Sequence, residues 1–125
     1  MALNLEDYYL PASLQEASSL LQRYGAGAMV VAGGTFVHGL EVRGLLAETV
    51  ALVDISRLEL RGISASSDGG VVLKALTTLA AVGEAPLISK NPAFGCIGDA
   101  LRYPPRQILN VGTVGGCVAA AAPLY

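Results

Sequence analysis

The 125-residue chain has the size of one ordinary domain, and its net charge of −2 with a pI near 5.2 argues against a nucleic-acid binder. Hydrophobic residues make up 53% of the chain and charged residues only 14%, which predicts a large core or an apolar face that meets a partner. Two cysteines are too few to hold an iron–sulfur cluster, and since the start shows no signal-peptide pattern we expect reduced thiols in a cytoplasmic protein.

The N-terminal half of the sequence predicts a small βαβ unit. Residues 7–11 are expected to be extended, because a residue that precedes proline is pushed out of the helical region. Residues 13–16 form a capping-box pattern, and apolar side chains then recur at helical spacing through Tyr24. Residues 29–32 and 49–55 are predicted to be buried strands, and their order with the helix favours parallel pairing.

A glycine-rich segment follows the predicted strand 29–32. Gly33, Gly34 and Thr35 indicate a turn that exposes several backbone N–H groups. Converging N–H groups bind anions, and a helix that starts at the turn would strengthen the binding. Residues 37–46 are predicted to form a short helix or a loop with one helical turn, because two glycines weaken a helix there.

A new subdomain is expected to begin near residues 57–60. Residues 60–66 and 70–75 favour strands, and the Asp68-Gly69 pair between them predicts a hairpin.

Short helices are predicted after the hairpin. Either Thr77 or Thr78 is expected to cap the first of them. Pro86 and Pro92 bracket a predicted loop, and residues 92–101 are predicted to form a further helix.

Residues 110–116 form a second glycine-rich segment that also contains a threonine. Neither segment matches G-x-G-x-x-G or the phosphate-loop pattern, so neither a Rossmann nor a P-loop assignment follows. We expect the two segments together to hold the diphosphate and ribityl region of one nucleotide-type cofactor. The uncharged stretch 107–125 lacks sustained Leu, Ile or Phe, which argues against a membrane span.

Catalysis by side chains has little support in the sequence. We interpret the single histidine, His38, as an exposed loop residue, with a phosphate or flavin contact as the alternative. The sequence shows no carboxylate cluster, nucleophile motif or metal-ligand spacing. We therefore predict no catalytic residue and no metal site, and expect a cofactor to carry any chemistry. A generic phosphate binder, which needs only one glycine segment, is an alternative.

Several stretches resemble, in order and spacing, the FAD-binding subunits of molybdenum hydroxylases, the family of carbon monoxide dehydrogenase medium subunits and xanthine dehydrogenase flavin domains. These stretches are residues 32–35, 52–57, 60–63, 72–78, 106–116 and the Ala122-Pro123 pair. The resemblance implies an α+β FAD-binding domain of the vanillyl-alcohol-oxidase type, with the flavin between two subdomains. Residues 1–58 would form the N-terminal βαβ subdomain and residues 59–125 the incomplete beginning of the second.

The resemblance also implies the site and the partners. The FAD-contacting residues would be Ala32, Gly33, Gly34, Thr35, Phe36, Val37, Gly112, Thr113, Gly115, Gly116 and Cys117. Non-covalent FAD would pass electrons between iron–sulfur clusters and an acceptor. The expected partners are a molybdenum-cofactor subunit and an iron–sulfur subunit; a homo-oligomer is left open, and no nucleic acid or membrane is expected.

The sequence departs from the family pattern at Phe36, Leu109, Cys117 and Ala122, where polar side chains are frequent. Each change removes a possible hydrogen bond worth about 0.5–1.5 kcal/mol. Family members continue beyond the position of residue 125, so the chain is similar to the front part of a longer protein. The alternative is a truncated remnant that no longer binds FAD and acts as a scaffold or oligomerising domain.

Overall fold

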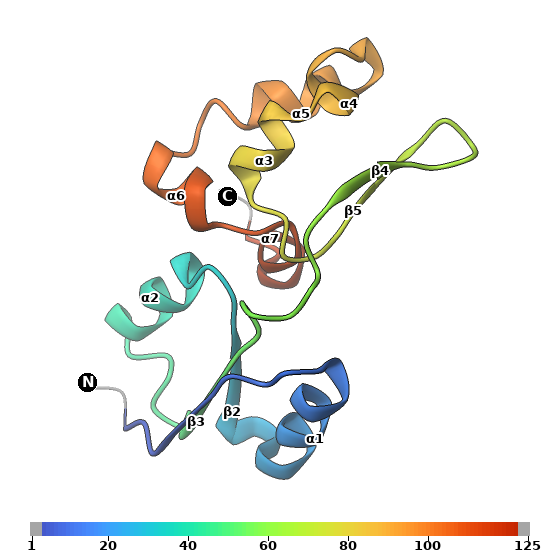
Figure 1. The fold of residues 1–125 in the computed structure, drawn as a ribbon. Helices are drawn as coiled ribbons and strands as arrows, with labels where there is room; N and C mark the ends of the chain where they lie inside the picture. Colours follow the sequence, from blue (N-terminus) through green and yellow to red (C-terminus); the bar gives the residue numbers. More distant parts are fainter. Residues whose placement is uncertain (1–3, 123–125) are drawn as a thin grey trace. The chain divides into compact units, whose positions relative to one another are not determined.

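The computed structural model describes residues 4–122, and the chain forms two compact units, Met1–Glu59 and Leu60–Tyr125 (Figure 1). Pro123, part of the Ala122-Pro123 resemblance, lies outside the described residues. Within residues 4–122, no helix has the length and apolar character needed to cross a lipid bilayer.

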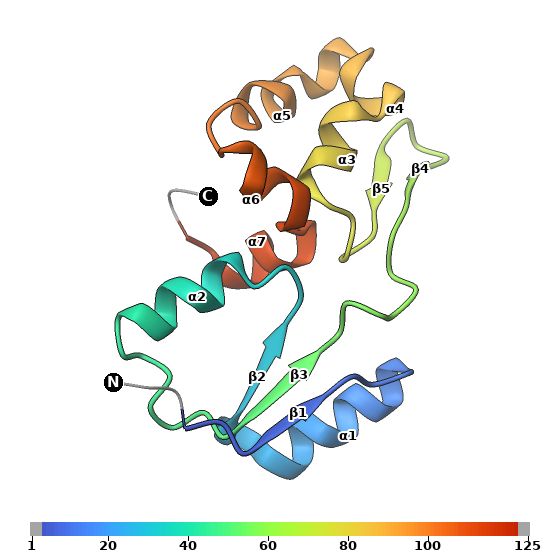
Figure 2. The same ribbon diagram turned by 60° about the vertical axis from the view of Figure 1, so that its left-hand side comes forward.

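The first unit is a three-stranded parallel sheet with one helix on each side (Figures 1 and 2). Its elements are β1 (Asp7–Tyr9), α1 (Leu14–Tyr24), a 3₁₀ turn (Gly25–Gly27), β2 (Ala28–Val31), α2 (Thr35–Val42) and β3 (Ala51–Asp54). The strand order is β1-β3-β2. Helix α1 therefore connects the two outer strands, β1 and β2, and α2 leads from β2 back to the central strand β3. Because both connections of a parallel sheet are right-handed, this change of direction puts the two helices on opposite faces. The predicted βαβ unit with parallel pairing is confirmed.

The core of the first unit centres on β3, where Ala51 and Val53 are fully buried. Leu52 and Asp54, on the other face of the strand, are only half-buried, so burial on both faces is not complete. The predicted capping box is present. Ser13 Oγ accepts the Glu16 N–H at 3.1 Å, and the Glu16 carboxylate reaches back to the Ala12 N–H at 2.7 Å.

Side-chain hydrogen bonds fasten β1 to its neighbours. The Tyr8 hydroxyl donates to the Asp54 carboxylate at the end of β3. The Tyr24 hydroxyl of α1 donates to Asp7 at 2.6 Å and lies 2.6 Å from the Tyr9 hydroxyl. Hydrogen bonding to Asp7, followed by that to Tyr9, raises the pKa of Tyr24 above its usual range, so the phenol stays protonated and holds α1 against the edge strand.

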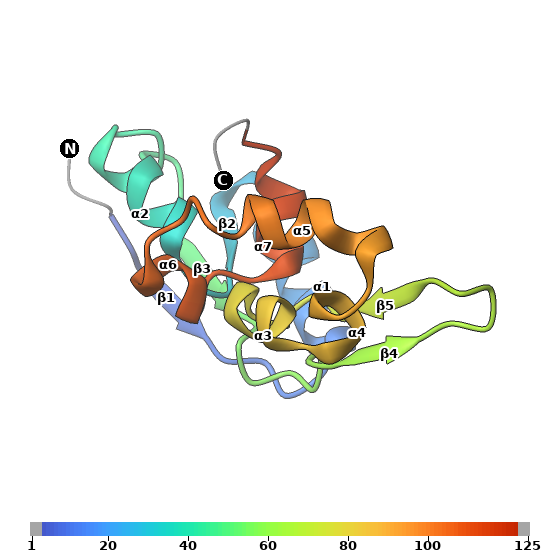
Figure 3. The same cartoon turned by 90° about the horizontal axis from the view of Figure 1, so that it is seen from above.

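The second unit begins with an antiparallel hairpin made of β4 (Ile63–Ala65) and β5 (Val71–Leu73). Asp68 closes its turn by accepting the Ser66 hydroxyl and, at 3.0 Å, the Gly70 N–H. Gly69 has a positive φ of 84°, which suits glycine at this position of a tight turn. The predicted hairpin is confirmed, and its turn projects beyond α3 and α4 (Figure 3).

Short helices make up the rest of the second unit. They are α3 (Leu79–Glu84), α4 (Pro86–Ser89), a 3₁₀ turn (Pro92–Phe94), α5 (Gly95–Ala100), α6 (Arg106–Val111) and α7 (Val114–Ala120). The predicted loop between Pro86 and Pro92 is wrong, because Pro86 starts α4 at a position where a helix needs no N–H donor. The predicted helix 92–101 is a 3₁₀ turn capped by Asn91 and then α5. Leu76, Val82 and Ile88 form the buried centre of this unit.

Candidate functional site

The first glycine segment is the junction between β2 and α2. Gly34 adopts the left-handed conformation, with φ 74° and ψ −3°, and is the N-cap residue of the helix. Residues other than glycine pay about 1–2 kcal/mol for that conformation. Of the two alternatives predicted for residues 37–46, the helix is correct. It starts two residues earlier than predicted, at Thr35, and ends at Val42.

The first turn of α2 contains backbone N–H groups that have no hydrogen-bond acceptor among the described residues. In the described part of the chain, the N–H groups of Thr35, Phe36 and Val37 reach no backbone carbonyl, and no side chain caps the helix. The first turn also contains no acidic side chain that would compete for these groups. A helix N-terminus carries a partial positive charge, so this arrangement fits a phosphate or another anion.

The same segment lies at the carboxyl edge of the parallel sheet. The Ile55 N–H donates to the Val31 carbonyl at 2.9 Å, which brings the end of β3 beside the end of β2. Open parallel sheets bind ligands outside this edge. Asp54, at the end of β3, is half-buried, which by itself would raise its pKa. Hydrogen bonds from Ser56 and Tyr8 outweigh that effect and hold the pKa of the carboxyl below its ordinary value.

The second glycine segment differs from the first, because the N–H groups of Val114, Gly115 and Gly116 already have partners. Thr113 is the N-cap residue of α7, and its hydroxyl oxygen accepts the Gly116 N–H at 3.1 Å. The Val114 N–H donates to the Thr77 carbonyl at 3.0 Å, and the Gly115 N–H donates to the Ala75 carbonyl at 2.7 Å. The N–H groups of Val114, Gly115 and Gly116 are therefore satisfied within the unit, in contrast to those at the start of α2.

Packing inside the second unit explains why this segment is rich in glycine. A Cβ atom on Gly115 would lie 2.9 Å from both the Cβ and the carbonyl oxygen of Ala75. A Cβ on Gly116 would lie 2.9 Å from the Thr113 hydroxyl oxygen, and one on Gly112 would lie 2.8 Å from the Ile108 carbonyl oxygen. The glycines let the backbone approach its neighbours closely.

Sequence reasoning missed the partners of this segment. Thr78 caps α3 by accepting the Ala81 N–H at 3.2 Å, as one of the two alternatives predicted, and it also forms an isolated antiparallel bridge with Thr113. The double-threonine pattern at 77–78 was a usable signal for the cap. Nothing local in the sequence indicates the bridge, because its two residues lie in distant parts of the chain.

The predicted site residues fall into two groups, one in each unit. Ala32 to Val37 lie together in the first unit, and Gly112 to Cys117 lie together in the second. Their assignment as cofactor contacts stays a prediction. His38 is on α2, not in a loop; its ring is 76% exposed and lies 3.8 Å from the Glu41 carboxylate. Within residues 4–122, no group of three or more His, Cys, Asp or Glu side chains could hold a metal ion.

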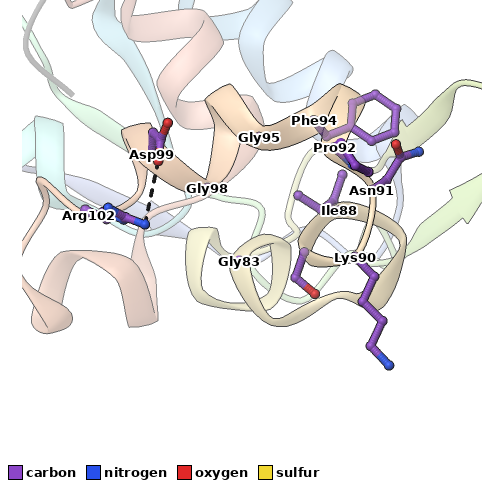
Figure 4. Close-up of a pocket in the computed structure, with 11 residues that line it drawn as sticks. Gly83, Ile88, Lys90, Asn91, Pro92, Phe94, Gly95, Gly98, Asp99 and Arg102 are labelled. Carbon is purple, nitrogen blue, oxygen red and sulfur yellow. Dashed lines mark ion pairs between the residues drawn. The ribbon is translucent and has the colours of Figure 1, made fainter.

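A surface pocket of about 380 Å³ lies in the second unit beside α4 and α5, and none of the predicted site residues lines it (Figure 4). Ile88 and Phe94 supply its apolar lining, and Asp99 and Arg102 flank it as an ion pair at 3.7 Å. Both charged side chains are strongly exposed, and such pairs contribute little to stability. The pocket therefore lacks the buried polar groups that orient a bound ligand.

Comparison with known proteins gives a consistent result. A family model described as the FAD binding domain in molybdopterin dehydrogenase matches residues 3–124. The carbon monoxide dehydrogenase medium chain of Hydrogenophaga pseudoflava is 32% identical over 120 residues, which cover 94% of this chain and 40% of that protein.

Solved structures agree with the sequence matches. A chain of the reconstituted carbon monoxide dehydrogenase from Oligotropha carboxidovorans superposes with a TM-score of 0.86 at 29% identity, covering 98% of this chain and 42% of that one. A chain of quinoline 2-oxidoreductase from Pseudomonas putida 86 superposes with a TM-score of 0.83 at 29% identity, covering 99% and 44%. The chain thus spans less than half the length of these relatives.

Proposed function

This chain belongs to the family of FAD-binding domains of molybdopterin dehydrogenases, and on that basis we propose that it is the FAD-holding component of a molybdenum-hydroxylase-type oxidoreductase. The resemblance recognised in the sequence is confirmed, as are the α+β fold and FAD as the cofactor of the family. The proposal extends this to what the chain does within a larger enzyme.

The start of α2 carries the proposal. We assign the FAD diphosphate to the N–H groups of Thr35, Phe36 and Val37, because these donors lack acceptors within the described residues. The residues directly before these donors are Ala32, Gly33 and Gly34, none of which has a bulky side chain. The helix dipole and the absence of an acidic residue in the first turn both favour a bound anion.

The second segment is proposed to contact the same cofactor in another way. Because the N–H groups of Val114, Gly115 and Gly116 already have acceptors, this segment would offer surface rather than free amide donors. Gly116 is exposed and has no side chain, so a ligand can approach its backbone closely. Both units would then be FAD-binding subdomains, with the division near residue 59.

Bound FAD supplies the redox chemistry, and the residues of this chain bind and orient it. We propose that the chain passes electrons between iron–sulfur clusters and an acceptor, as part of a cytoplasmic assembly with a molybdenum-cofactor subunit and an iron–sulfur subunit. The support for partner subunits is that one relative is named as the medium chain of carbon monoxide dehydrogenase.

Titration of the purified chain with flavins tests the proposal. FAD and ADP should both bind, whereas riboflavin, which has no phosphate, should bind at least tenfold more weakly. This order follows because the proposed contacts are amide donors to the diphosphate. If gel filtration separates the protein from all flavin after incubation with excess FAD, the chain does not hold the cofactor and the proposal fails.

The alternative function, a scaffold or oligomerising domain without FAD, is favoured by large apolar side chains on the surface. Tyr103 is 82% exposed, Val118 75% and Val42 71%. Light scattering on the same samples separates the two candidates. An oligomer that binds no flavin supports the scaffold, and a compact monomer that binds FAD contradicts it.

A further inference from the structure

We propose that Asp54 is a further contact of the FAD site, where its carboxylate accepts hydroxyl groups of a sugar unit of the cofactor. The inference rests on the proposed function, because it takes the start of α2 as the place where the diphosphate binds. Asp54 is also the hydrogen-bond partner of Tyr8 at the end of β3. That structural role uses only part of the acceptor capacity of the carboxylate.

Asp54 lies on the face of the sheet that belongs to α2. Side chains alternate along a strand, so Ala51 and Val53 point to one face and Asp54 points to the other. The first of these faces is covered by α1, because the Tyr24 hydroxyl of α1 donates to Asp7, the residue opposite Ala51. Since the two helices lie on opposite faces, Asp54 shares its face with α2.

Asp54 also lies at the end of the sheet where α2 begins (Figure 2). It is the last residue of β3 and is paired in register with Val31, the last residue of β2. Only residues 32–34 separate Val31 from the first turn of α2. A carboxylate and the N–H groups proposed to bind the diphosphate are therefore placed at one edge and one face of the same sheet.

The Asp54 carboxylate can accept further hydrogen bonds. Its Oδ1 atom accepts the Ser56 N–H at 2.9 Å, and its Oδ2 atom accepts the Tyr8 hydroxyl. Each carboxylate oxygen offers about two acceptor positions, so each retains one beyond these bonds. The residue is half-buried and thus not closed off from solvent. Because a carboxylate repels phosphate, the groups that suit it in FAD are hydroxyls and not the diphosphate.

This pair of groups fits a nucleotide better than an isolated anion. In FAD, sugar hydroxyls adjoin the diphosphate on both sides, in the ribose and in the ribityl chain. In dinucleotide-binding βαβ units, an acidic residue about 20 residues beyond the glycine turn accepts a ribose hydroxyl. Asp54 has this position relative to Gly34, at the end of the strand that follows the helix. We therefore expect the ribose to be the sugar that Asp54 binds.

Calorimetric titration with ADP, 2′,3′-dideoxy-ADP and pyrophosphate tests the assignment. The wild type should bind ADP about tenfold more tightly than the dideoxy analogue, because hydrogen bonds to a charged acceptor are lost with the hydroxyls. In Asp54→Ala the two ligands should bind equally within about twofold. Pyrophosphate, which has no hydroxyl group on a sugar, should bind to this variant at least as tightly as to the wild type.

Two control variants separate ligand binding from structure. Asp7→Ala also removes one negative charge and a hydrogen bond between a tyrosine and a carboxylate, but on the opposite face of the sheet. Tyr8→Phe removes the structural partner of Asp54 and keeps the carboxylate. Both variants should retain the preference for ADP. If either loses it as completely as Asp54→Ala does, the role of Asp54 is structural and the proposal is overturned.

FMN distinguishes the two sugars, because it contains the ribityl hydroxyls and lacks the ribose. Weaker binding of FMN by Asp54→Ala, with ADP unchanged, would assign Asp54 to the ribityl chain and keep its role as a hydroxyl acceptor. Should Asp54→Ala fail to fold, NMR of the wild type decides. ADP or FMN should shift the carboxyl carbon resonance of Asp54 more than pyrophosphate does, and equal shifts would overturn the proposal.

Failure of the proposed function gives a different result. A wild type that binds neither FAD nor pyrophosphate would overturn the assignment of the diphosphate to α2, and that of the sugar to Asp54 with it. A wild type that binds pyrophosphate and FAD, with no response of Asp54 to the hydroxyls of ADP or FMN, would overturn only the present inference.

Discussion

Thr78 and Thr113 pair in an isolated antiparallel bridge, and each of them caps the helix that follows it. Thr78 is the N-cap residue of α3 and Thr113 is the N-cap residue of α7, so the two helices begin side by side in the second unit. Thr113 is 6% exposed, and its hydroxyl oxygen accepts the Gly116 N–H. This pairing ties the position of a proposed FAD segment to the fold of the unit.

Thr113→Ala should lower the free energy of unfolding by about 1 kcal/mol, because it removes the helix cap. Thr113→Ser keeps the hydroxyl oxygen and should lose less. Urea unfolding followed by circular dichroism measures both variants. Equal losses in the two variants would mean that the buried methyl group, and not the cap, supplies the stability.

Gly34→Ala should weaken FAD binding, with Gly44→Ala as a matched control. Both glycines have left-handed backbones, with φ values of 74° and 69°, and no residue of 4–122 beyond the immediate chain neighbours places a side-chain atom closer than 4.0 Å to an added Cβ at either position. Both variants should therefore lose similar stability, about 1–2 kcal/mol. Only Gly34 precedes the free N–H groups of α2, so only Gly34→Ala should raise the dissociation constant for FAD, measured by flavin fluorescence. Equal binding by the two variants would contradict the assignment of the diphosphate to α2.

The Tyr8–Asp54 hydrogen bond should make stability depend on pH. The pKa of Asp54 is lowered in the folded chain, so its contribution is complete above the ordinary value of about 3.9 and is lost as the pH falls through the folded pKa. Hydrogen bonding to Asp54 raises the pKa of Tyr8, so the contribution of the phenol is complete below about pH 10 and is lost as the pH rises further.

Tyr8→Phe removes the donor and should flatten the fall of the melting temperature between about pH 4 and pH 2. Tyr103→Phe is the control, because Tyr103 is 82% exposed. Thermal unfolding across this pH range measures the effect. Parallel curves for the wild type and Tyr8→Phe would show that the hydrogen bond does not set the acid dependence.

Leu76→Ala should destabilise the second unit by about 2–5 kcal/mol, because it leaves a cavity beside a side chain that is 1% exposed. Val118→Ala removes a similar apolar side chain that is 75% exposed, and should change stability by less than about 0.5 kcal/mol. Denaturant midpoints of the two variants provide the comparison. A large loss for Val118→Ala would reveal that this residue is covered by another molecule in solution.

Local chemistry explains which parts of the fold were predictable from the sequence. The capping box at Ser13 and the hairpin turn at Asp68 each depend on side chains within a few residues of each other, and both are present as predicted. The start of α2 was placed too late, because its N-cap is Gly34 and no capping side chain marks it. The glycine pattern at the second segment could not reveal Ala75 as its packing partner, since that contact joins distant parts of the chain.

The two glycine segments should follow different courses during evolution. Gly34 serves a proposed ligand contact, so a lineage that dispenses with flavin has no reason to keep it beyond the turn geometry. Gly115 is demanded by the methyl group and carbonyl of Ala75, so it should persist in such a lineage. Retention of glycine at position 115 together with changes at position 34 would therefore indicate a lineage that has kept the fold of the second unit and lost the cofactor.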